Sequence, residues 1–159
     1  MLIELKKLAV RFENEGQKTL AFFEGLNAAH WPLVVYRDDQ VWTVHDLLAH
    51  FVEVEGSIPA LIRSILQGGP GVSEEFDIDQ HNQKETPLMA EHPRQFLLDE
   101  FKRLRGETVS LVQGMHPNDL AMEGRHPFLG RTSIKEMLKL MTIHLNLHLR
   151  DIKRMLQEM

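Results

Sequence analysis

Apolar side chains recur every three or four residues in four separate stretches of this chain of 159 residues. Such spacing places the apolar side chains on one face of an α-helix. No stretch shows the alternation of a convincing β-strand. The predicted helices span residues 2–28, 43–67, 93–114 and 133–157. Four amphipathic helices without a sheet predict an all-α fold, a four-helix bundle, and the length fits one domain over residues 1–159.

Local signals set the ends of these helices. Trp31-Pro32 stops the first, because the residue before a proline is pushed out of the α region. Thr43 can cap the start of the second helix. Ser133 and Glu136 have the spacing of a capping box at the start of the last helix. The helix starts are therefore better defined by the sequence than the connections between them.

Three connections join the predicted helices, over residues 29–42, 68–92 and 121–132. The segment 68–92 is polar and has no clear apolar stripe, although a short helix near 75–83 is compatible with it. A connection of this length is typical of a lid, a binding loop or a crossover. We expect at least one of the three connections to border any functional pocket.

Composition and charge exclude several classes of partner. The net charge is −5 and the 18 lysines and arginines are scattered, which disfavours a nucleic-acid partner. The absence of cysteine excludes disulfides, thiolate metal ligands and a thiol nucleophile of the protein itself. The first residues are charged, and no apolar run has membrane-spanning length. We therefore expect a cytoplasmic protein without a membrane partner.

Two histidines stand four residues apart in the last predicted helix, so they project from the same helical face. These residues, His144 and His148, fall in the apolar stripe of that helix between Met141 and Ile152. Such a pair can hold two positions of a divalent metal if another helix supplies a third ligand. The alternative is that both rings pack in the core with satisfied hydrogen bonds. The spacing alone leaves both interpretations open.

A candidate third ligand, His50, lies at the border of the apolar face of the second predicted helix. Bundles build metal sites from side chains on facing helices, which makes this position suitable. The other histidines fall at helix ends or in connections, where we expect them to be solvated. These are His30, His45, His81, His92, His116 and His126.

Three segments resemble the DinB/YfiT-like superfamily. Residues 42–50, Trp-Thr-Val-His-Asp-Leu-Leu-Ala-His, resemble the opening of that family's second helix. Residues 126–132, His-Pro-Phe-Leu-Gly-Arg-Thr, resemble the loop before its last helix. Residues 144–148 match its H-x-x-x-H motif. The segments occur in the family's order between about residues 42 and 152, and together they are fairly specific.

The resemblance implies a compact four-helix bundle that holds a divalent metal with three histidines. Carried over position by position, the ligands are His50, His144 and His148. The metal that we expect from the resemblance is zinc or nickel, with iron or manganese as alternatives. Many relatives have an acidic residue directly after the first histidine of the last helix, where this chain has Leu145. This chain therefore lacks that acid, whereas the ligand positions are intact.

Three imidazoles leave a coordination position open, which is typical of a catalytic rather than a structural site. Family members of known activity include transferases that use low-molecular-weight thiols such as bacillithiol or mycothiol. The expected function is therefore a metal-dependent thiol S-transferase or a hydrolase that acts on a small molecule. The absence of cysteine fits both, since an external thiol or water would be activated. The alternative is a non-catalytic stress or interaction protein, a homodimer that binds metal incidentally.

The catalytic residues are unknown, and each candidate beside the histidines has a structural alternative. Asp46 could orient His50 or only favour the start of the helix. Glu53 could act as a general base or be a surface residue. Arg125 and Arg131 could bind an anionic cosubstrate, or they could only cap local structure and contact solvent. Two aromatic residues could line the pocket mouth or pack in the core, Trp42 and Phe128.

Overall fold

The computed structural model describes residues 2–159 and confirms the all-α class. Within these residues the chain forms five α-helices, two short 3₁₀-helices and two β-hairpins. The α-helices are α1 (Leu2–Glu24), α2 (Val44–Leu66), α3 (Ile78–Ala90), α4 (Arg94–Gln113) and α5 (Ile134–Gln157). The 3₁₀-helices are η1 (Ala28–His30) and η2 (Pro117–Ala121). The strands are β1 (Val34–Tyr36), β2 (Trp42–Thr43), β3 (Glu123–His126) and β4 (Gly130–Ser133).

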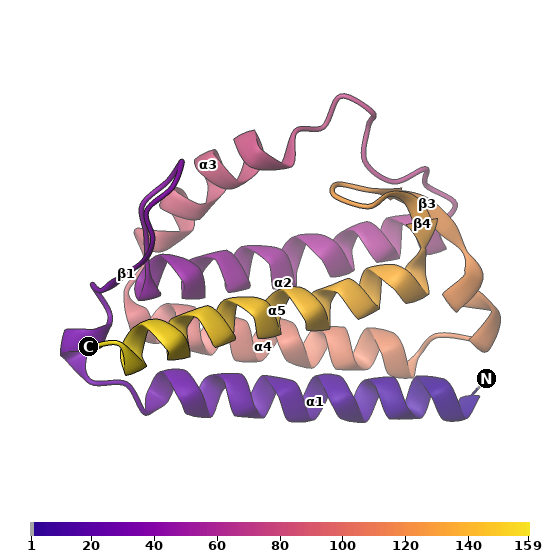
Figure 1. Ribbon diagram of the computed structural model, residues 1–159. Helices are drawn as coiled ribbons and strands as arrows, with labels where there is room; N and C mark the ends of the chain where they lie inside the picture. Colours follow the sequence, from indigo (N-terminus) through magenta and orange to yellow (C-terminus); the bar gives the residue numbers. More distant parts are fainter. Residues whose placement is uncertain (1) are drawn as a thin grey trace.

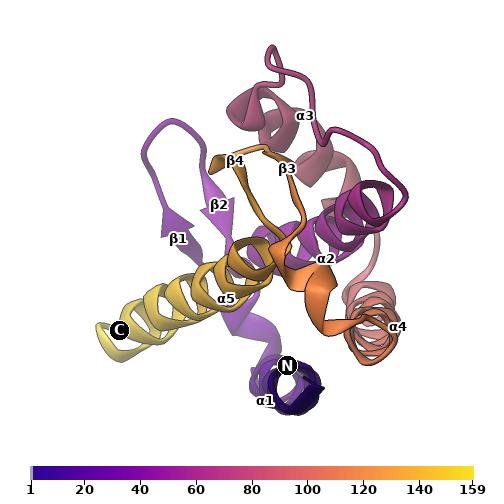
Figure 2. The ribbon, with the colours of Figure 1, turned by 90° about the vertical axis from the view of Figure 1, so that its right-hand side faces the viewer.

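The bundle consists of α1, α2, α4 and α5, with α3 lying on the outside against α2 (Figure 1). Helices α2 and α4 run in the same direction, opposite to α1 and α5. Because α2 and α4 run in the same direction, the chain must return along the bundle between them. The segment that contains α3 makes this return, so the connection 68–92 is a crossover. Figure 2 shows the bundle from its end, with α3 and both hairpins on the side of α2 and α5 away from α1.

The four predicted helices correspond to α1, α2, α4 and α5 to within four residues at each end. Thr43 caps α2 as predicted: its Oγ1 accepts from the Asp46 amide at 3.1 Å, and Asp46 Oδ2 accepts from the Thr43 amide at 2.9 Å. Ser133 caps α5 through the Glu136 amide at 3.2 Å. The reciprocal half of the predicted capping box at Ser133 is not formed.

Residues 78–90 form a longer helix than the short one near 75–83 that the sequence allowed. Asp77 caps it, with Oδ1 accepting from the amides of Asp79 at 3.0 Å and Gln80 at 3.2 Å. The only side chain that the helix buries is Thr86. The helix therefore lacks the apolar stripe by which the other helices were predicted.

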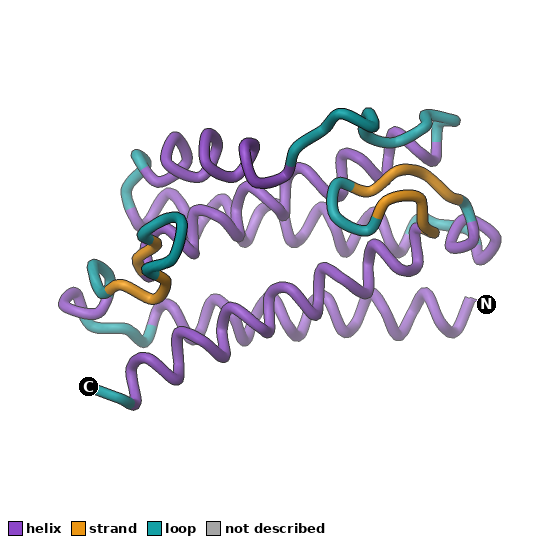
Figure 3. The backbone as a smooth tube through the Cα atoms, turned by 45° about the horizontal axis from the view of Figure 1, so that its top comes forward, coloured by secondary structure: helices purple, strands orange, loops and turns teal. Residues whose placement is uncertain are grey.

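The two hairpins lie in connections where we predicted no strands. Strands β1 and β2 pair in the connection 29–42, and β3 and β4 pair in the connection 121–132. They occupy opposite ends of the molecule (Figure 3). The second hairpin is also fixed to the chain after α2, because the Val72 amide donates to Arg125 O and the Arg125 amide to Pro70 O, both at 2.9 Å. Gly71 between them has φ 95° and leaves no room for a Cβ atom, which would lie 2.2 Å from Arg125 N.

The apolar core has two clusters, one toward each end of the bundle. The first includes Phe12 and Met137, and the second includes Phe23, Phe51 and Phe101. On α2 and on α4, a buried polar group lies in the sequence between the residues of the two clusters. None of the helices within residues 2–159 has the length and hydropathy needed to cross a membrane.

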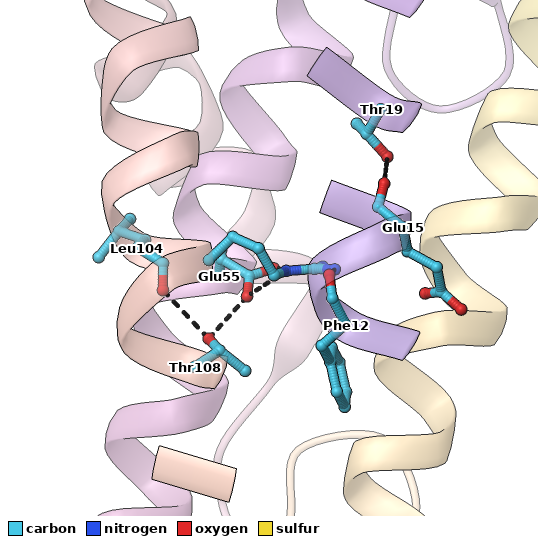
Figure 4. Close-up of polar contacts among 7 residues, drawn as sticks. Phe12, Glu15, Thr19, Glu55, Leu104 and Thr108 are labelled. Carbon is cyan, nitrogen blue, oxygen red and sulfur yellow. Dashed lines mark hydrogen bonds and ion pairs between the residues drawn. The ribbon is translucent and has the colours of Figure 1, made fainter. Parts of the chain in front are cut away.

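The buried polar group joins three helices (Figure 4). Arg105 of α4 donates from Nε and Nη2 to the two carboxylate oxygens of Glu55 of α2, at 2.9 and 2.8 Å. Its Nη1 donates to Phe12 O of α1 at 3.0 Å, and Thr108 Oγ1 donates to Glu55 at 2.7 Å. The ion pair is bidentate and its charges are satisfied, which is the condition for tolerating such a pair in a core.

Candidate metal centre

The structure brings the three predicted ligands together. His50 comes from α2, and His144 and His148 come from neighbouring turns of α5. The Nε2 atom of His144 lies 3.0 Å from Nε2 of His50 and 3.0 Å from Nε2 of His148. One ring nitrogen from each residue lies within 4.8 Å of the others, so the group could bind a metal ion.

Hydrogen bonding alone does not satisfy this arrangement. Nε2 of His144 carries either one proton or one lone pair, so it can form a hydrogen bond to only one of its two neighbours. The other contact would then oppose two like groups or share the same proton or lone pair in a weaker three-centre hydrogen bond. A cation removes the conflict, because all three nitrogens can direct lone pairs at it. Nitrogens bound to one ion at about 2.0–2.1 Å must lie within about 4 Å of each other, which both 3.0 Å contacts satisfy. The residues therefore fit a divalent metal.

The two histidines of α5 share a face as predicted, but that face is not the centre of the buried stripe. Leu145 and Leu149, one residue further along, are buried, whereas His144 and His148 are half-buried. One residue is a rotation of about 100° around the helix. The leucines therefore pack in the core, and the histidines lie beside them. The prediction that both rings occupy the core stripe is wrong in this respect.

Two residues that sequence reasoning missed fix the orientation of His148. Tyr36 of β1 donates its hydroxyl proton to Asp151 Oδ2 at 2.5 Å. The Tyr36 hydroxyl oxygen also lies 2.8 Å from His148 Nδ1. Because the hydroxyl proton is already donated to Asp151, this oxygen must accept the proton of His148 Nδ1. Burial, together with the bond to Asp151, raises the pKa of Tyr36 well above its ordinary value. His148 is thereby held with Nδ1 protonated and with the lone pair of Nε2 toward the other histidines.

His50 has no corresponding partner. Its Nδ1 is buried and meets no hydrogen-bond partner within residues 2–159. Asp46, which could have oriented the ring, instead bonds the Thr43 amide at the start of α2. The ring is held by packing, with the Trp42 ring centroid 4.8 Å away. Asp46 therefore stabilises the start of α2 and does not orient His50. Trp42 packs against the ring of this candidate ligand.

Burial keeps the three imidazoles neutral. Desolvation lowers the pKa of His50 well below its ordinary value, with smaller effects from His144 and His148. It also lowers the pKa of His144 and of His148 to about 4, although Asp151 partly opposes this at His148. Neutral rings at neutral pH have the lone pairs that a metal needs.

A cavity of about 310 Å³ opens beside His50 and His144. Helices α2, α3 and α5 and the β3–β4 hairpin border it, so two of the three predicted connections contribute to its wall. Phe128, 72% exposed, lies at its edge as expected for a pocket mouth. Most of the remaining wall is apolar and is formed by Val54, Ile58, Ile78, Leu140, Met141 and Leu147.

The comparison with known families agrees with this geometry. Residues 11–152 match the sequence model of the DinB superfamily. The chain belongs to the DinB superfamily. No curated protein matches the sequence. The matched region includes all three histidines, and a group that could bind a metal agrees with membership of a metal-binding family.

In this DinB-superfamily chain, α3 places a second pair of polar residues on the cavity. His81 Nε2 donates to Glu53 Oε1 at 2.7 Å. The Glu53 side chain lines the cavity and is only 12% exposed. The expectation that His81 is a solvated loop residue is wrong, because residues 78–90 form a helix that packs on α2.

His126 is also not the solvated loop residue that we expected. It ends β3, is 6% exposed and lines the cavity. The turn after β3 wraps around its ring, so that the amides of Phe128 and Leu129 donate to its Nδ1 at 3.0 and 3.1 Å. Desolvation, with a smaller effect of His144, lowers the pKa of His126 to about 4.

The remaining candidates lie away from the histidines of this DinB bundle. Arg125 pairs with Glu74 at 3.0 Å and Arg131 with Glu123 at 3.2 Å, and neither arginine lines the histidine cavity. These positions favour a structural role for both arginines over the binding of an anionic cosubstrate. His45, expected to be exposed, is half-buried, with Nε2 3.0 Å from Ala90 O.

Proposed function

We propose that this DinB-superfamily protein is a metal-dependent enzyme that transfers a low-molecular-weight thiol to a small, largely apolar molecule. The observation that carries the proposal is the convergence of three histidine Nε2 atoms beside an apolar cavity of about 310 Å³. A buried cluster that served only packing would not need an adjoining cavity.

We assign a different role to each group of residues at or beside the cavity. His50, His144 and His148 would hold zinc or nickel, which supplies a site where a thiol or water loses its proton near neutral pH. The protein has no cysteine, so the thiol must be a second substrate. Glu53, oriented by His81, is a carboxylate on the cavity wall that can accept the thiol proton. The apolar wall binds the acceptor molecule and excludes water.

Hydrolysis is the second candidate, and the same Glu53–His81 pair favours it. A carboxylate held by one hydrogen bond beside the cavity could also take a proton from water whose pKa a bound metal would lower. The non-catalytic alternative requires only the histidines. Thiol transfer needs a reduced thiol, so we expect the protein to act in the cytoplasm. A homodimer is the assembly that we expect, and light scattering of the purified protein tests it.

Metal dependence tests the function. Protein purified without a histidine tag is loaded with zinc or nickel and mixed with monochlorobimane and, in turn, bacillithiol, mycothiol and glutathione. We expect conjugation by the loaded protein and its loss in His148→Ala, with the helical circular dichroism unchanged. His92→Ala, which removes an exposed histidine, is the matched control.

The outcomes separate the candidates. An equal conjugation rate from metal-free protein would count decisively against thiol transfer. Release of p-nitrophenol from p-nitrophenyl acetate without conjugation would favour hydrolysis. Stoichiometric metal binding with neither reaction would favour the non-catalytic alternative.

A further inference from the structure

The turn after β3 determines which nitrogen of His126 carries the proton. Two backbone amides, those of Phe128 and Leu129, donate to Nδ1 at 3.0 and 3.1 Å. A nitrogen that accepts hydrogen bonds carries no proton. The neutral ring therefore has its single proton on Nε2, on the opposite edge from the turn. Unlike the metal-centre histidines, this ring is fixed as a donor.

The donor edge of His126 faces no hydrogen-bond acceptor in the part of the chain that the structure describes. The residue is 6% exposed, and it lines the same cavity as His50 and His144. Across residues 2–159, no acceptor forms a hydrogen bond with its Nε2. An apolar ligand that fills the cavity would leave this donor without an acceptor, at a cost in free energy. A fixed N–H group on a cavity wall is thus suited to a ligand that brings an acceptor.

We propose that His126 is a specificity-determining residue, whose Nε2–H donates a hydrogen bond to a carbonyl oxygen of an otherwise apolar substrate. The inference rests on the proposed function and names the substrate class, an apolar carbonyl compound. The apolar wall selects the body of such a molecule, and the fixed donor selects its oxygen. An apolar molecule without an acceptor would leave the N–H group unsatisfied.

The chain offers a variant that separates this role from the structural one. Asparagine carries Oδ1 at the position of the ring Nδ1, and it commonly accepts from the amides of such a turn. His126→Asn therefore keeps the acceptor for Phe128 and Leu129 and removes the donor that faces the cavity. His126→Ala removes both, so it reports the cost to the hairpin.

The test uses the metal-free protein and two probes, acetophenone and ethylbenzene, titrated in nuclear magnetic resonance experiments. We expect wild-type protein to bind acetophenone about 3- to 10-fold more tightly than His126→Asn does, the effect of one hydrogen bond. Ethylbenzene should bind both proteins equally. The imidazole ¹⁵N spectrum should show the proton of His126 on Nε2, and that signal should shift with acetophenone.

Three results would overturn the inference. They are a proton on Nδ1, an equal effect of the substitution on both probes, and no binding of acetophenone by the wild type at millimolar concentration. The measurement is independent of the metal reaction. Failure of metal binding or thiol conjugation, with the ketone preference intact, would reject the proposed function alone. Metal-dependent thiol conjugation without a preference for acetophenone would reject the substrate class alone.

Discussion

The proton positions at the histidine centre are set by residues that are not ligands. Tyr36 donates to Asp151 and accepts from His148, so the order of these hydrogen bonds leaves the Nε2 lone pair of His148 for a metal. His126 has the opposite arrangement, because backbone amides occupy its Nδ1. Two histidines near one cavity thus differ in whether they offer a lone pair or a proton. The contacts of their Nδ1 atoms decide which.

Tyr36→Phe should weaken metal binding without removing a ligand. The ring contact with His148, with centroids 5.6 Å apart, is retained by phenylalanine, whereas the acceptor for Nδ1–H is lost. We expect metal affinity to fall about 10- to 100-fold, as for other residues that orient a metal-binding histidine. Competition with a chromophoric zinc chelator measures the change. An affinity equal to that of the wild type would show that packing alone orients the ring.

The sequence identified the converging histidines but not the residues that orient them. The spacing of His144 and His148 is a local property of one helix, and the resemblance supplied His50. Asp151 lies three residues after His148 and could have been found by the same helical spacing. Tyr36 could not, because it reaches the site through a hairpin 112 residues away along the chain. The tautomer of His126 depends on a turn that no periodicity predicts.

At the scale of elements, the buried ion pair fixes how α1, α2 and α4 meet. Arg105 extends past α1 to reach Glu55, and its position depends on the absence of a side chain at Gly16. A Cβ atom at Gly16 would lie 2.7 Å from Cγ of Arg105. The arginine cannot move aside freely, because its guanidinium is bonded to Glu55 and to Phe12 O.

Gly16→Ala should therefore destabilise the protein although alanine favours helices. Gly106→Ala in α4 is the matched control, since a Cβ atom there meets nothing within 4 Å. We expect the control to raise the free energy of unfolding by about 0.5–1 kcal/mol. Gly16→Ala should lower it by about 1–3 kcal/mol, the usual cost of overpacking a core. Urea denaturation of both variants measures the difference, and equal stabilisation would mean that Arg105 adjusts without cost.

The bundle helices could be predicted from sequence because each buries a long apolar stripe. Helix α3 could not be outlined in the same way, since Thr86 is its only buried residue. The strands have two to four residues each, which is too short for alternation to be recognised. Pairing between residues 70–72 and Arg125 also depends on contacts between distant parts of the chain. The elements that could be predicted are those whose buried face can be recognised within one continuous stretch of sequence.

At the scale of the whole molecule, the topology places the cavity at the histidines. The parallel course of α2 and α4 requires a crossover, and that crossover carries α3 along the side of α2 that bears His50 and Glu53 (Figure 1). The β3–β4 hairpin closes the cavity from the end where α5 begins. The site thus combines a sequence-local pair of candidate ligands with a wall that only the complete fold provides.

The same burial predicts how stability depends on pH. The pKa values of His126, His144 and His148 are lowered to about 4, and that of His50 is also lowered, whereas in an unfolded chain each is near about 6.5. Between these values the unfolded metal-free protein binds up to four more protons than the folded protein. Its free energy of unfolding should therefore fall as the pH is lowered from about 6.5 to about 4. Bound metal should add stability at neutral pH that is lost over the same range, because protons compete for the ligands.

Urea denaturation of metal-free protein at several pH values between 7.5 and 4.5 measures this dependence. His144→Gln replaces one titrating ring by a neutral side chain, so it should reduce the slope by at most about 1.4 kcal/mol per pH unit. His92→Ala, which removes an exposed histidine outside the cluster, is the control. A wild-type slope equal to that of His144→Gln would mean that the pKa of His144 is the same in the folded and the unfolded chain. Burial would then not be what keeps this ring neutral.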